Sequence, residues 1–338
     1  MVDVRHARAG AVVGALALAA GLSLGGGAGA ASQEVLRLGH DQPTAHGYQE
    51  AGNFLNERFQ EATGGAHEVR IFPGAQLGNE MAMLDEVLAG NLDMSIAAAA
   101  NAATFVPELG MFSVSYLFSG PDHFKRVLND AQFNAMIDEI IASKELGMRR
   151  IATFTAGARN VYNNKGPVAT VEDLGNMKMR VMASPIESQV WTQLGTLPVS
   201  IPFGDVYTGM QTGLVEGAEN AAAVYASNKH YEVAPYYSLT GHQWLIAFMF
   251  MNEDAYQALP EEGRAALDQA GQDMTDHVID FVIESDAQFV EEMKEKYGVQ
   301  VNEVDTGPFV ERLGPLQDEV AGELGMEEVV ARIRELRS

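Results

Sequence analysis

One arginine in an apolar segment is the first residue whose chemistry suggests a site. Arg180 lies between Met177 and Met182, in a segment whose apolar pattern predicts a β-strand. Ser184 and Pro185 follow as the N-cap and the first residue of a predicted helix. A guanidinium group is planar, remains charged and binds both oxygens of a carboxylate. Arg180 is therefore a candidate carboxylate ligand, and the alternative interpretation is a surface arginine at a strand end.

A second arginine occurs among small residues. A strand is predicted over 150–155, and Arg159 lies in the following segment from Ala156 to Asn164, which we interpret as a turn. Helices are predicted from 121, over 131–145, over 184–194 and over 203–212, and Glu219 and Asn220 come after the last of these. Arg180 would then lie at the end of a strand and Arg159 after one, and both would supply local positive charge.

The first part of the chain predicts a parallel sheet. Strands are predicted over 34–39, 69–72 and 92–97, separated by helices over 48–62 and 79–89. This alternation is typical of parallel strands joined by right-handed crossovers. Ligands of such sheets bind beyond the carboxyl ends of the strands. The rule points to His40, Asp41, the Gln76–Glu80 turn and the segment from Ala98 to Asn101.

The C-terminal third predicts one long helix. Pro260 and two glutamates open a helical pattern that continues to about Tyr297. A helix of that length spans roughly 55 Å, which is longer than one small domain needs. We therefore expect a helix that runs across two lobes, and the alternative is a helix broken near Gly271.

Composition limits the classes of partner. The chain has 338 residues, which predicts two domains, and its formal net charge is −24. Because so acidic a chain has no field that gathers phosphate, we expect neither nucleic acid nor an anionic membrane surface as a partner. The absence of cysteine from the sequence excludes disulfides, thiol nucleophiles and cysteine-ligated metals. A small anionic ligand stays compatible with local positive charge.

The N-terminus predicts export. Arg5 and Arg8 precede an apolar segment from Ala11 to Leu24, and Ala28–Ala30 forms a small-residue cleavage site. We expect a signal peptide over residues 1–30 and a mature protein in the periplasm. The apolar segment is too short and too rich in alanine and glycine to predict a membrane anchor.

A set of short motifs in a fixed order resembles the substrate-binding proteins of TRAP (tripartite ATP-independent periplasmic) transporters, of the C4-dicarboxylate-binding type. The resemblance extends over nearly the whole mature chain. The motifs are Leu36–His40, Phe72–Gly78, Leu92–Met94, Phe105–Glu108, Met179–Val181, Pro202–Tyr207, Gln211–Asn220, Lys229–Val233 and Thr240–His242.

The resemblance implies an α/β, two-lobed periplasmic binding protein fold with a long helix at the hinge. Residues 33–156 and 246–285 would form lobe I, residues 157–245 and 286–338 would form lobe II, and the helix over 261–297 would cross both. The lobes would close on one small organic acid, and the closed protein would dock on the membrane subunits of the transporter. We expect a monomer without a cofactor or a metal.

The resemblance also assigns residues to the ligand site. Arg180 matches the arginine that pairs with the ligand carboxylate, and Arg159 and Asn220 match residues that assist it. Phe203 matches an aromatic wall, and Ala221 departs from a proline that is common in the family. Three residues, His40, Glu80 and Asn101, match family positions that contact the part of the ligand away from its carboxylate. We add His242 and Trp244 as residues within reach of the cleft.

Several of these residues have simpler interpretations. Glu80 is alternatively a solvated acid at a helix N-terminus, His40 a strand-end histidine and Trp244 a core residue. As ligands, Glu80 and Asn101 suit hydroxyl groups, and Glu80 would repel a second carboxylate. This favours a sugar acid such as a hexuronate or an aldonate, while a C4-dicarboxylate, a sulfonate or an ectoine-like solute stays open.

An enzyme is the competing class of protein. Glu80 and His40 are then an acid–base pair in a secreted hydrolase or lyase. The motif G-x-S-x-G occurs only at Gly21–Gly25, inside the predicted signal peptide, and H-E-x-x-H does not occur in the sequence. We therefore expect a binding protein that is not an enzyme, and an interaction protein such as an exported chaperone is the third class.

Overall fold

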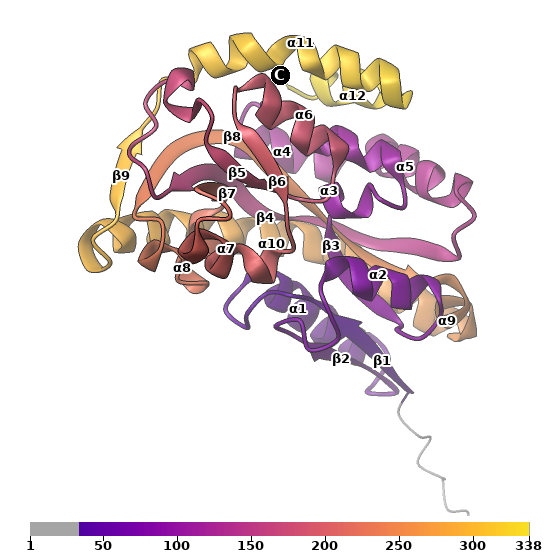
Figure 1. Ribbon diagram of the computed structural model, residues 1–338. Coiled ribbons are helices and arrows are strands. Elements are labelled where there is room, and N and C mark those ends of the chain that lie inside the picture. Colours follow the sequence, from indigo (N-terminus) through magenta and orange to yellow (C-terminus); the bar gives the residue numbers. More distant parts are fainter. Residues whose placement is uncertain (1–33, 338) are drawn as a thin grey trace, which may run out of the picture. The chain divides into compact units, whose positions relative to one another are not determined.

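A mixed β-sheet of nine strands organises residues 34–337, which are the residues that the computed structural model describes (Figure 1). Neighbouring strands follow the order β2-β1-β3-β8-β4-β7-β5-β6, and β9 pairs with β8. The strands are β1 (Glu34–Gly39), β2 (His67–Phe72), β3 (Met94–Ala98), β4 (Met148–Asn163), β5 (Lys178–Val181), β6 (Leu197–Ser200), β7 (Gly217–Asn220), β8 (Tyr236–Asn252) and β9 (Gln300–Glu303).

Helices cover both faces of this sheet. The α-helices are α1 (Gly47–Ala62), α2 (Glu80–Leu88), α3 (Ala99–Ala102), α4 (Pro121–Leu128), α5 (Ala131–Ser143), α6 (Pro185–Gln193), α7 (Val206–Thr212), α8 (Ala222–Ser227), α9 (Glu253–Ala258), α10 (Glu261–Lys296), α11 (Gly307–Leu324) and α12 (Glu327–Glu335). Short 3-10 helices occur at Pro107–Ser113, Val171–Leu174, Phe203–Asp205 and His230–Glu232.

The predicted parallel sheet at the start of the chain is confirmed. Strand β1 pairs in parallel with both β2 and β3, and helices α1 and α2 connect these strands. Asn79 caps α2 by accepting the backbone N–H of Ala82 at 3.0 Å. Because all three strands run in the same direction, their carboxyl ends bring His40, Glu80 and Asn101 to one edge of the sheet.

Two long strands, β8 and β4, join this parallel part to a second group of strands, which consists of β7, β5 and β6. Strand β4 has 16 residues and β8 has 17, and they pair in antiparallel orientation over almost their whole lengths. The interpretation of Ala156–Asn164 as a turn is therefore wrong, because Arg159 lies inside β4. The small residues mark an irregularity instead: the register shifts between Thr155 and Ala158, and Gly157 has a φ of 107°. Such a bulge bends a strand without ending it.

The predicted long helix is also confirmed. Helix α10 runs without a break over 36 residues (Figure 1). Gly271 does not interrupt it, because this glycine serves close packing: a Cβ at this position would lie 2.4 Å from the carbonyl oxygen of Ile151 on β4. The alternative of a helix broken near Gly271 is therefore wrong.

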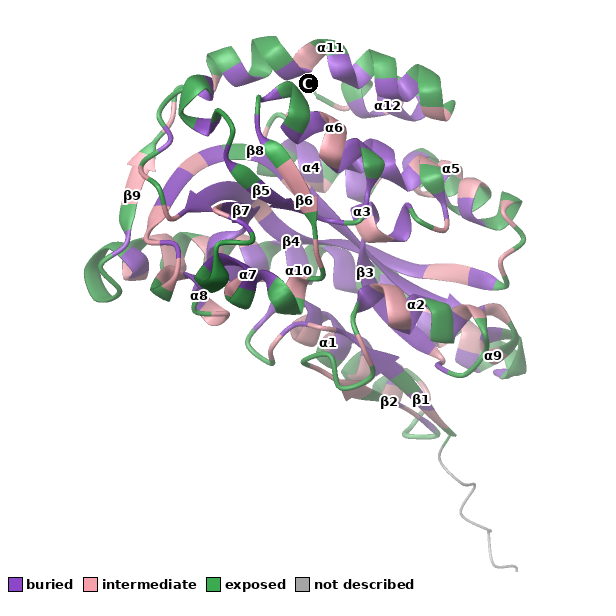
Figure 2. Cartoon of the chain, in the orientation of Figure 1, coloured by how far each residue is buried: buried purple, intermediate pink, exposed green. Residues whose placement is uncertain are grey.

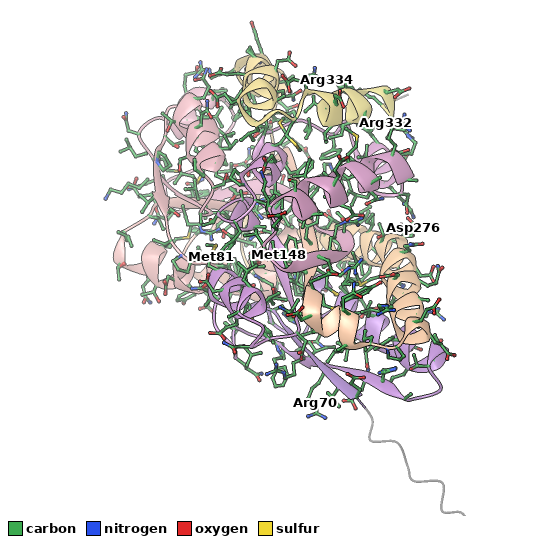
Figure 3. All side chains as sticks on the ribbon, turned by 90° about the vertical axis from the view of Figure 1, so that its right-hand side faces the viewer. Arg70, Met81, Met148, Asp276, Arg332 and Arg334 are labelled. Carbon is green, nitrogen blue, oxygen red and sulfur yellow. The ribbon has the colours of Figure 1, made fainter. Side chains whose placement is uncertain are left out.

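The core extends over both groups of strands. Figure 2 shows β4 and β8 almost entirely buried, with exposed residues concentrated on the outer faces of the helices. On the surface, Arg332 of α12 binds Asp130, the N-cap of α5, with its Nη2 atom 2.6 Å from Oδ2. Figure 3 shows Arg332 and Arg334 on this C-terminal helix. The ion pair ties the end of the chain to α5.

The predicted signal peptide lies outside the described residues. Within residues 34–337, no helix has the length and apolar character that crossing a membrane requires.

Candidate functional site

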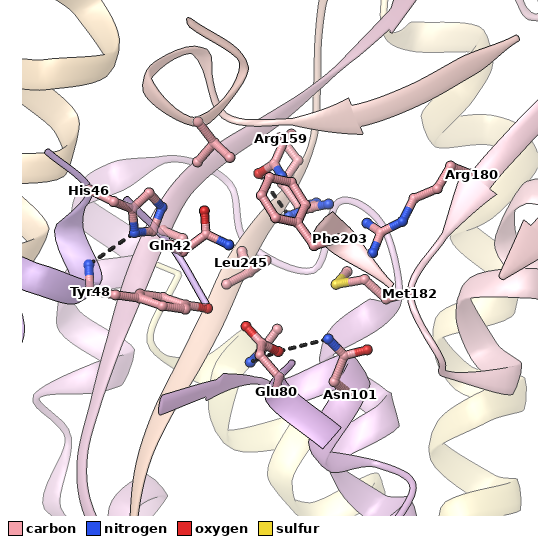
Figure 4. Close-up of a pocket in the computed structure, with 14 residues that line it drawn as sticks. Gln42, His46, Tyr48, Glu80, Asn101, Arg159, Arg180, Met182, Phe203 and Leu245 are labelled. Carbon is pink, nitrogen blue, oxygen red and sulfur yellow. Dashed lines mark hydrogen bonds between the residues drawn. The ribbon is translucent and has the colours of Figure 1, made fainter. Parts of the chain in front are cut away.

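A pocket lies where the carboxyl ends of the first parallel strands face the second group of strands, β7, β5 and β6 (Figure 4). It brings together six of the nine residues that the sequence analysis assigned to a ligand site. These are Arg159, Arg180, Asn220, Glu80, Asn101 and Phe203.

Arg159 forms a buried ion pair with Glu219. Its Nε and Nη2 atoms form a fork with the Glu219 carboxylate, in which Nη2 lies 2.5 Å from Oε1, and Nη1 donates to Oδ1 of Asn220 at 3.0 Å. Burial by itself would raise the pKa of Glu219, but the charge and hydrogen bonds of Arg159 lower it to about 2. Glu219 is therefore ionised, and it neutralises Arg159.

Arg180 has no such partner. Its side chain is buried, and its Nε atom donates to the carbonyl oxygen of Ile201 at 3.1 Å. Among residues 34–337, no carboxylate forms an ion pair with it. Burial lowers its pKa, yet an arginine remains charged at neutral pH. Figure 4 shows its guanidinium directed toward Met182 and the pocket, and the Phe203 ring lies 5.9 Å from the guanidinium carbon. The wall therefore carries a buried positive charge without a direct ion-pair partner among the described residues, although the Glu219 carboxylate lies near enough to favour it.

Glu80 faces the arginines from the opposite side of the pocket. Its Oε2 atom accepts the backbone N–H of Ala98 at 2.9 Å and the Asn101 amide at 2.7 Å. The side chain is buried, so the interpretation of Glu80 as a solvated helix-end acid is wrong. Burial, followed by the nearby Asp41 carboxylate, raises the pKa of Glu80 to about 8. At neutral pH this carboxyl group is mainly uncharged, and it can donate or accept a hydrogen bond.

The side-chain amide of Asn101 is fixed by two hydrogen bonds, which leave it less able to adapt to a ligand. Its amide nitrogen donates to Glu80, and its amide oxygen accepts the backbone N–H of Ala183 at 3.0 Å. Ala183 lies immediately before Ser184, which caps α6 as predicted. Asn101 therefore links α3 to the segment between β5 and α6, across the pocket that it lines.

The other three predicted residues do not line this pocket. His40 is buried, and its Nε2 atom lies 3.3 Å from Oε1 of Gln49. His242 lies between the Thr240 hydroxyl, at 2.9 Å, and the Glu219 carboxylate. Trp244 stacks on Phe124 at a centroid distance of 5.3 Å and packs against the core, as its alternative interpretation had it.

Strand geometry explains the positions on β8. Successive side chains of a strand point to opposite faces, so Trp244 and Leu245 cannot both face the pocket. Leu245 is the one that lines it. The expectation that Trp244 lies within reach of the cleft is therefore corrected by its place on the opposite face of β8.

Several pocket residues were not identified from the sequence. They are Gln42, Tyr48, Ala156, Met182, Val224 and Leu245. The rule for the carboxyl ends of parallel strands reached His40 and Asp41, and the loop after β1 continues from there. Gln42 was within reach of that rule, whereas nothing local marks Met182, Val224 or Leu245 as pocket residues.

The described residues offer no evident place for a metal. No three histidine, aspartate or glutamate side chains of residues 34–337 gather in an arrangement that could hold an ion. What this pocket offers is a buried cation, a carboxyl group and hydrogen-bonding side chains. Such a set can bind a small polar anion.

Comparison with known proteins identifies the family of this chain. Residues 38–323 match the family described as bacterial extracellular solute-binding protein, family 7. The 2,3-diketo-L-gulonate-binding periplasmic protein YiaO of Escherichia coli is 29% identical over 280 residues, which cover 82% of this chain and 84% of YiaO.

Two solved structures of TRAP periplasmic solute-binding proteins show the same fold. The protein from Roseobacter denitrificans, with bound β-D-glucuronate, is 28% identical with a TM-score of 0.82, covering 89% of this chain and 99% of that one. The protein from Sulfitobacter, with bound β-D-galacturonate, is 26% identical with a TM-score of 0.82, covering 89% and 100%. The predicted two-lobed α/β fold with a long helix is thus confirmed, and the chain belongs to family 7 of the bacterial extracellular solute-binding proteins, the solute-binding proteins of TRAP transporters.

Proposed function

We propose that this protein binds a sugar acid, of the hexuronate or aldonate class, for uptake by a TRAP transporter. The proposal rests on one observation: Arg180 is a buried cation at the pocket wall that forms no ion pair with a carboxylate of the described residues. A buried charge without a partner is unfavourable, and a ligand carboxylate supplies the partner that this guanidinium lacks.

The charges around the pocket favour one carboxylate in the ligand. Arg159 is neutralised by Glu219, so Arg180 provides the net positive charge of this wall. On the opposite side, Asp41 is an acidic group that a second carboxylate would approach at a cost, and the mainly uncharged Glu80 beside it supplies no positive charge to offset that cost. Hydroxyl groups meet these side chains without a charge penalty. The pocket therefore favours a polyhydroxylated monoacid over a C4-dicarboxylate.

The similar proteins support the same class of ligand. Both structural neighbours described above contain a hexuronate, and the E. coli relative is named for a keto sugar acid. Sulfonates and ectoine-like solutes offer an anionic group to Arg180, but they lack the hydroxyl groups that suit Glu80. They are the alternative ligands, followed by C4-dicarboxylates.

The mechanism that we propose is closure of two lobes around the ligand. The predicted lobe boundaries at 156/157 and 245/246 lie at the bulge of β4, where Thr155 is opposite Ile246 of β8. Arg180 and Glu80 belong to different predicted lobes, so a ligand contacts both only when the lobes are close together. Binding then shifts the population toward the closed form by its differential affinity for that form.

The protein would act outside the cytoplasm. A cleaved signal peptide over residues 1–30 would deliver it to the periplasm, where the closed form would dock on the membrane subunits of the transporter as a monomer. An acid–base enzyme that uses Glu80 and His40 has no support from the geometry, because His40 does not line the pocket.

A thermal-shift screen of the mature protein tests the proposal. The panel contains hexuronates, aldonates, C4-dicarboxylates, sulfonates, ectoine and amino acids. A ligand at 100 times its dissociation constant stabilises the folded state by about 2.7 kcal/mol, which raises the melting temperature visibly. We expect shifts with sugar acids. Shifts confined to dicarboxylates would overturn the sugar-acid assignment, and consumption of a bound acid during incubation would support the enzyme instead.

A further inference from the structure

A buried amide in the pocket wall has an acceptor without a partner. Gln42 is 6% exposed and lines the pocket, and its Nε2 atom donates to Oδ1 of Asp41 at 2.8 Å. Because an ionised carboxylate only accepts hydrogen bonds, Asp41 fixes the orientation of this amide. The Oε1 atom is then the free end, and no group of residues 34–337 donates to it. Buried acceptors in native proteins normally have a donor.

A histidine beside this amide supplies a donor. The Nδ1 atom of His46 accepts the backbone N–H of Tyr48 at 3.0 Å and so caps helix α1. An Nδ1 atom that accepts carries no proton, so the neutral ring carries its proton on Nε2. Burial lowers the pKa of His46 to about 3, which keeps the ring neutral at physiological pH. No acceptor for Nε2 occurs among the described residues.

These two side chains lie away from the arginine that we assign to the ligand carboxylate. Figure 4 shows Gln42, His46 and Tyr48 on one side of the pocket and Arg180 on the other, with Glu80 and Asn101 between them. We propose that Gln42 and His46 form a hydroxyl-binding subsite for the end of the ligand that is distant from its carboxylate. This inference rests on the proposed function and extends it to the specificity of the same site.

The chemistry of the pair selects a hydroxyl group. A hydroxyl donates to Oε1 of Gln42 and accepts from Nε2 of His46, and therefore satisfies both groups at once. A carboxylate accepts from His46 but has no proton for Gln42, and it adds negative charge near Asp41. An ammonium group donates to Gln42 but confronts the N–H of His46. The subsite therefore discriminates against diacids and zwitterions at this end of the ligand.

Two variants remove the polar groups with little other change. Gln42→Met keeps the length of the side chain and removes its acceptor, together with the amide donor that binds Asp41. His46→Asn removes the ring donor but keeps a side-chain oxygen that can cap α1, since asparagine is a favoured N-cap. Gln257→Met is the matched control, because Gln257 is an exposed residue of α9 whose side chain bonds only Glu253 and Arg264.

The experiment measures dissociation constants by calorimetry for D-gluconate, D-glucarate, D-glucuronate and D-glycerate. Gluconate and glucarate differ only at the end distant from C1, where glucarate has a carboxylate. We expect the wild type to bind gluconate or glucuronate at least about tenfold more tightly than glucarate. Each variant should bind the preferred six-carbon acid about tenfold more weakly and bind glycerate as the wild type does, while Gln257→Met changes neither.

The outcomes separate this inference from the proposed function. Wild-type protein that binds none of the four acids overturns both. Wild-type binding of a six-carbon acid that Gln42→Met and His46→Asn leave unchanged overturns the subsite alone. An equal loss of glycerate binding in the variants also overturns it, because such a loss reports a general distortion of the pocket. Circular dichroism and the melting temperature without ligand verify that both variants fold.

Discussion

The side-chain oxygen of Asn101 accepts the backbone N–H of Ala183 at 3.0 Å. Asn101 lies on α3, at the end of β3, whereas Ala183 lies between β5 and α6, so this bond connects two segments that are 82 residues apart. The same amide donates to Glu80 at 2.7 Å. One side chain thus connects the acidic side of the pocket to the loop that follows the Arg180 strand.

Removing this link should weaken ligand binding. We expect Asn101→Ala to raise the dissociation constant for a sugar acid about tenfold or more, because two hydrogen bonds are lost and Glu80 loses a donor. Isothermal titration calorimetry measures the change, and Asn53→Ala on the exposed face of α1 is the control. Unchanged affinity in Asn101→Ala would show that the link contributes nothing to the bound form.

Arg180 should affect binding and stability in opposite directions. Arg180→Ala leaves the ligand carboxylate buried without a partner, and we expect it to cost about 2–5 kcal/mol of binding free energy. The ligand-free protein should lose little stability or gain some, because a buried cation without a carboxylate partner is removed. Calorimetry and urea unfolding measure the two quantities. An affinity equal to that of the wild type would contradict the assignment of the carboxylate site.

Glu219 should behave differently, since it is needed by the ligand-free fold. Glu219→Gln leaves the charge of buried Arg159 without its partner, and we expect a loss of about 3–5 kcal/mol in the free energy of unfolding. Replacing both residues, as Arg159→Met with Glu219→Gln, should recover part of that loss. Urea unfolding of the two single variants and the double variant measures the coupling, and strictly additive effects would argue against the ion pair.

The residues that were predicted correctly have strong local patterns. Arg180 follows from an apolar strand that ends three residues before a Ser-Pro helix start, and α10 from a helical pattern that no proline interrupts. The rule for the carboxyl ends of parallel strands indicated the segments that contain Glu80 and Asn101, and the resemblance to the TRAP binding proteins selected these two residues within them. Local signals of this kind require no knowledge of distant partners.

The residues that were missed or misplaced depend on distant contacts. The turn that we expected around Arg159 is part of β4, because pairing with β8 outweighs the small residues near Gly157. Strand β8 itself contains the run Leu245–Met251, which is apolar on both faces and therefore lacks the alternation that identifies a strand. Glu219 gives no local sign that it neutralises an arginine 60 residues away.

Glu80 should make stability depend on pH. Its pKa is raised from 4.5 in the reference state to about 8 in the fold, so the folded state holds a proton that the unfolded state has lost. Between these values the free energy of unfolding falls as pH rises, by at most about 1.4 kcal/mol per pH unit for one group. Burial lowers the pKa values of His40, His46 and His230, so these histidines act in the opposite direction below pH 6.5.

The informative range is therefore pH 7–8. Burial also raises the pKa values of Glu187 and Asp286 to about 7, so the pH dependence that they give to the free energy of unfolding decreases across this range. We expect Glu80→Gln to lose less stability than the wild type between pH 7 and pH 8, as measured by urea unfolding. Glu328→Gln, at an exposed position of α12, should follow the wild type. Parallel pH profiles of Glu80→Gln and the wild type would contradict the raised pKa.

The contact between α10 and β4 predicts an unusual response to a helix-favouring substitution. Alanine is preferred to glycine in a helix by about 1 kcal/mol, so Gly271→Ala should stabilise an isolated helix. In the folded protein, the new Cβ would lie 2.4 Å from the backbone oxygen of Ile151, which cannot rotate away. We therefore expect a net loss of about 1–3 kcal/mol, as is typical of overpacking.

A second helical glycine provides the control for this experiment. At Gly322, on the exposed side of α11, a Cβ would have only the Glu327 side chain at 4.0 Å, so Gly322→Ala should gain up to about 1 kcal/mol. Thermal and urea unfolding of the two variants give the comparison. Stabilisation by both substitutions would mean that α10 can move away from β4 at little cost. If Gly271→Ala lowers the free energy of unfolding and Gly322→Ala raises it, Gly271 is needed for the close approach of the long helix α10 to β4, the strand that carries Arg159.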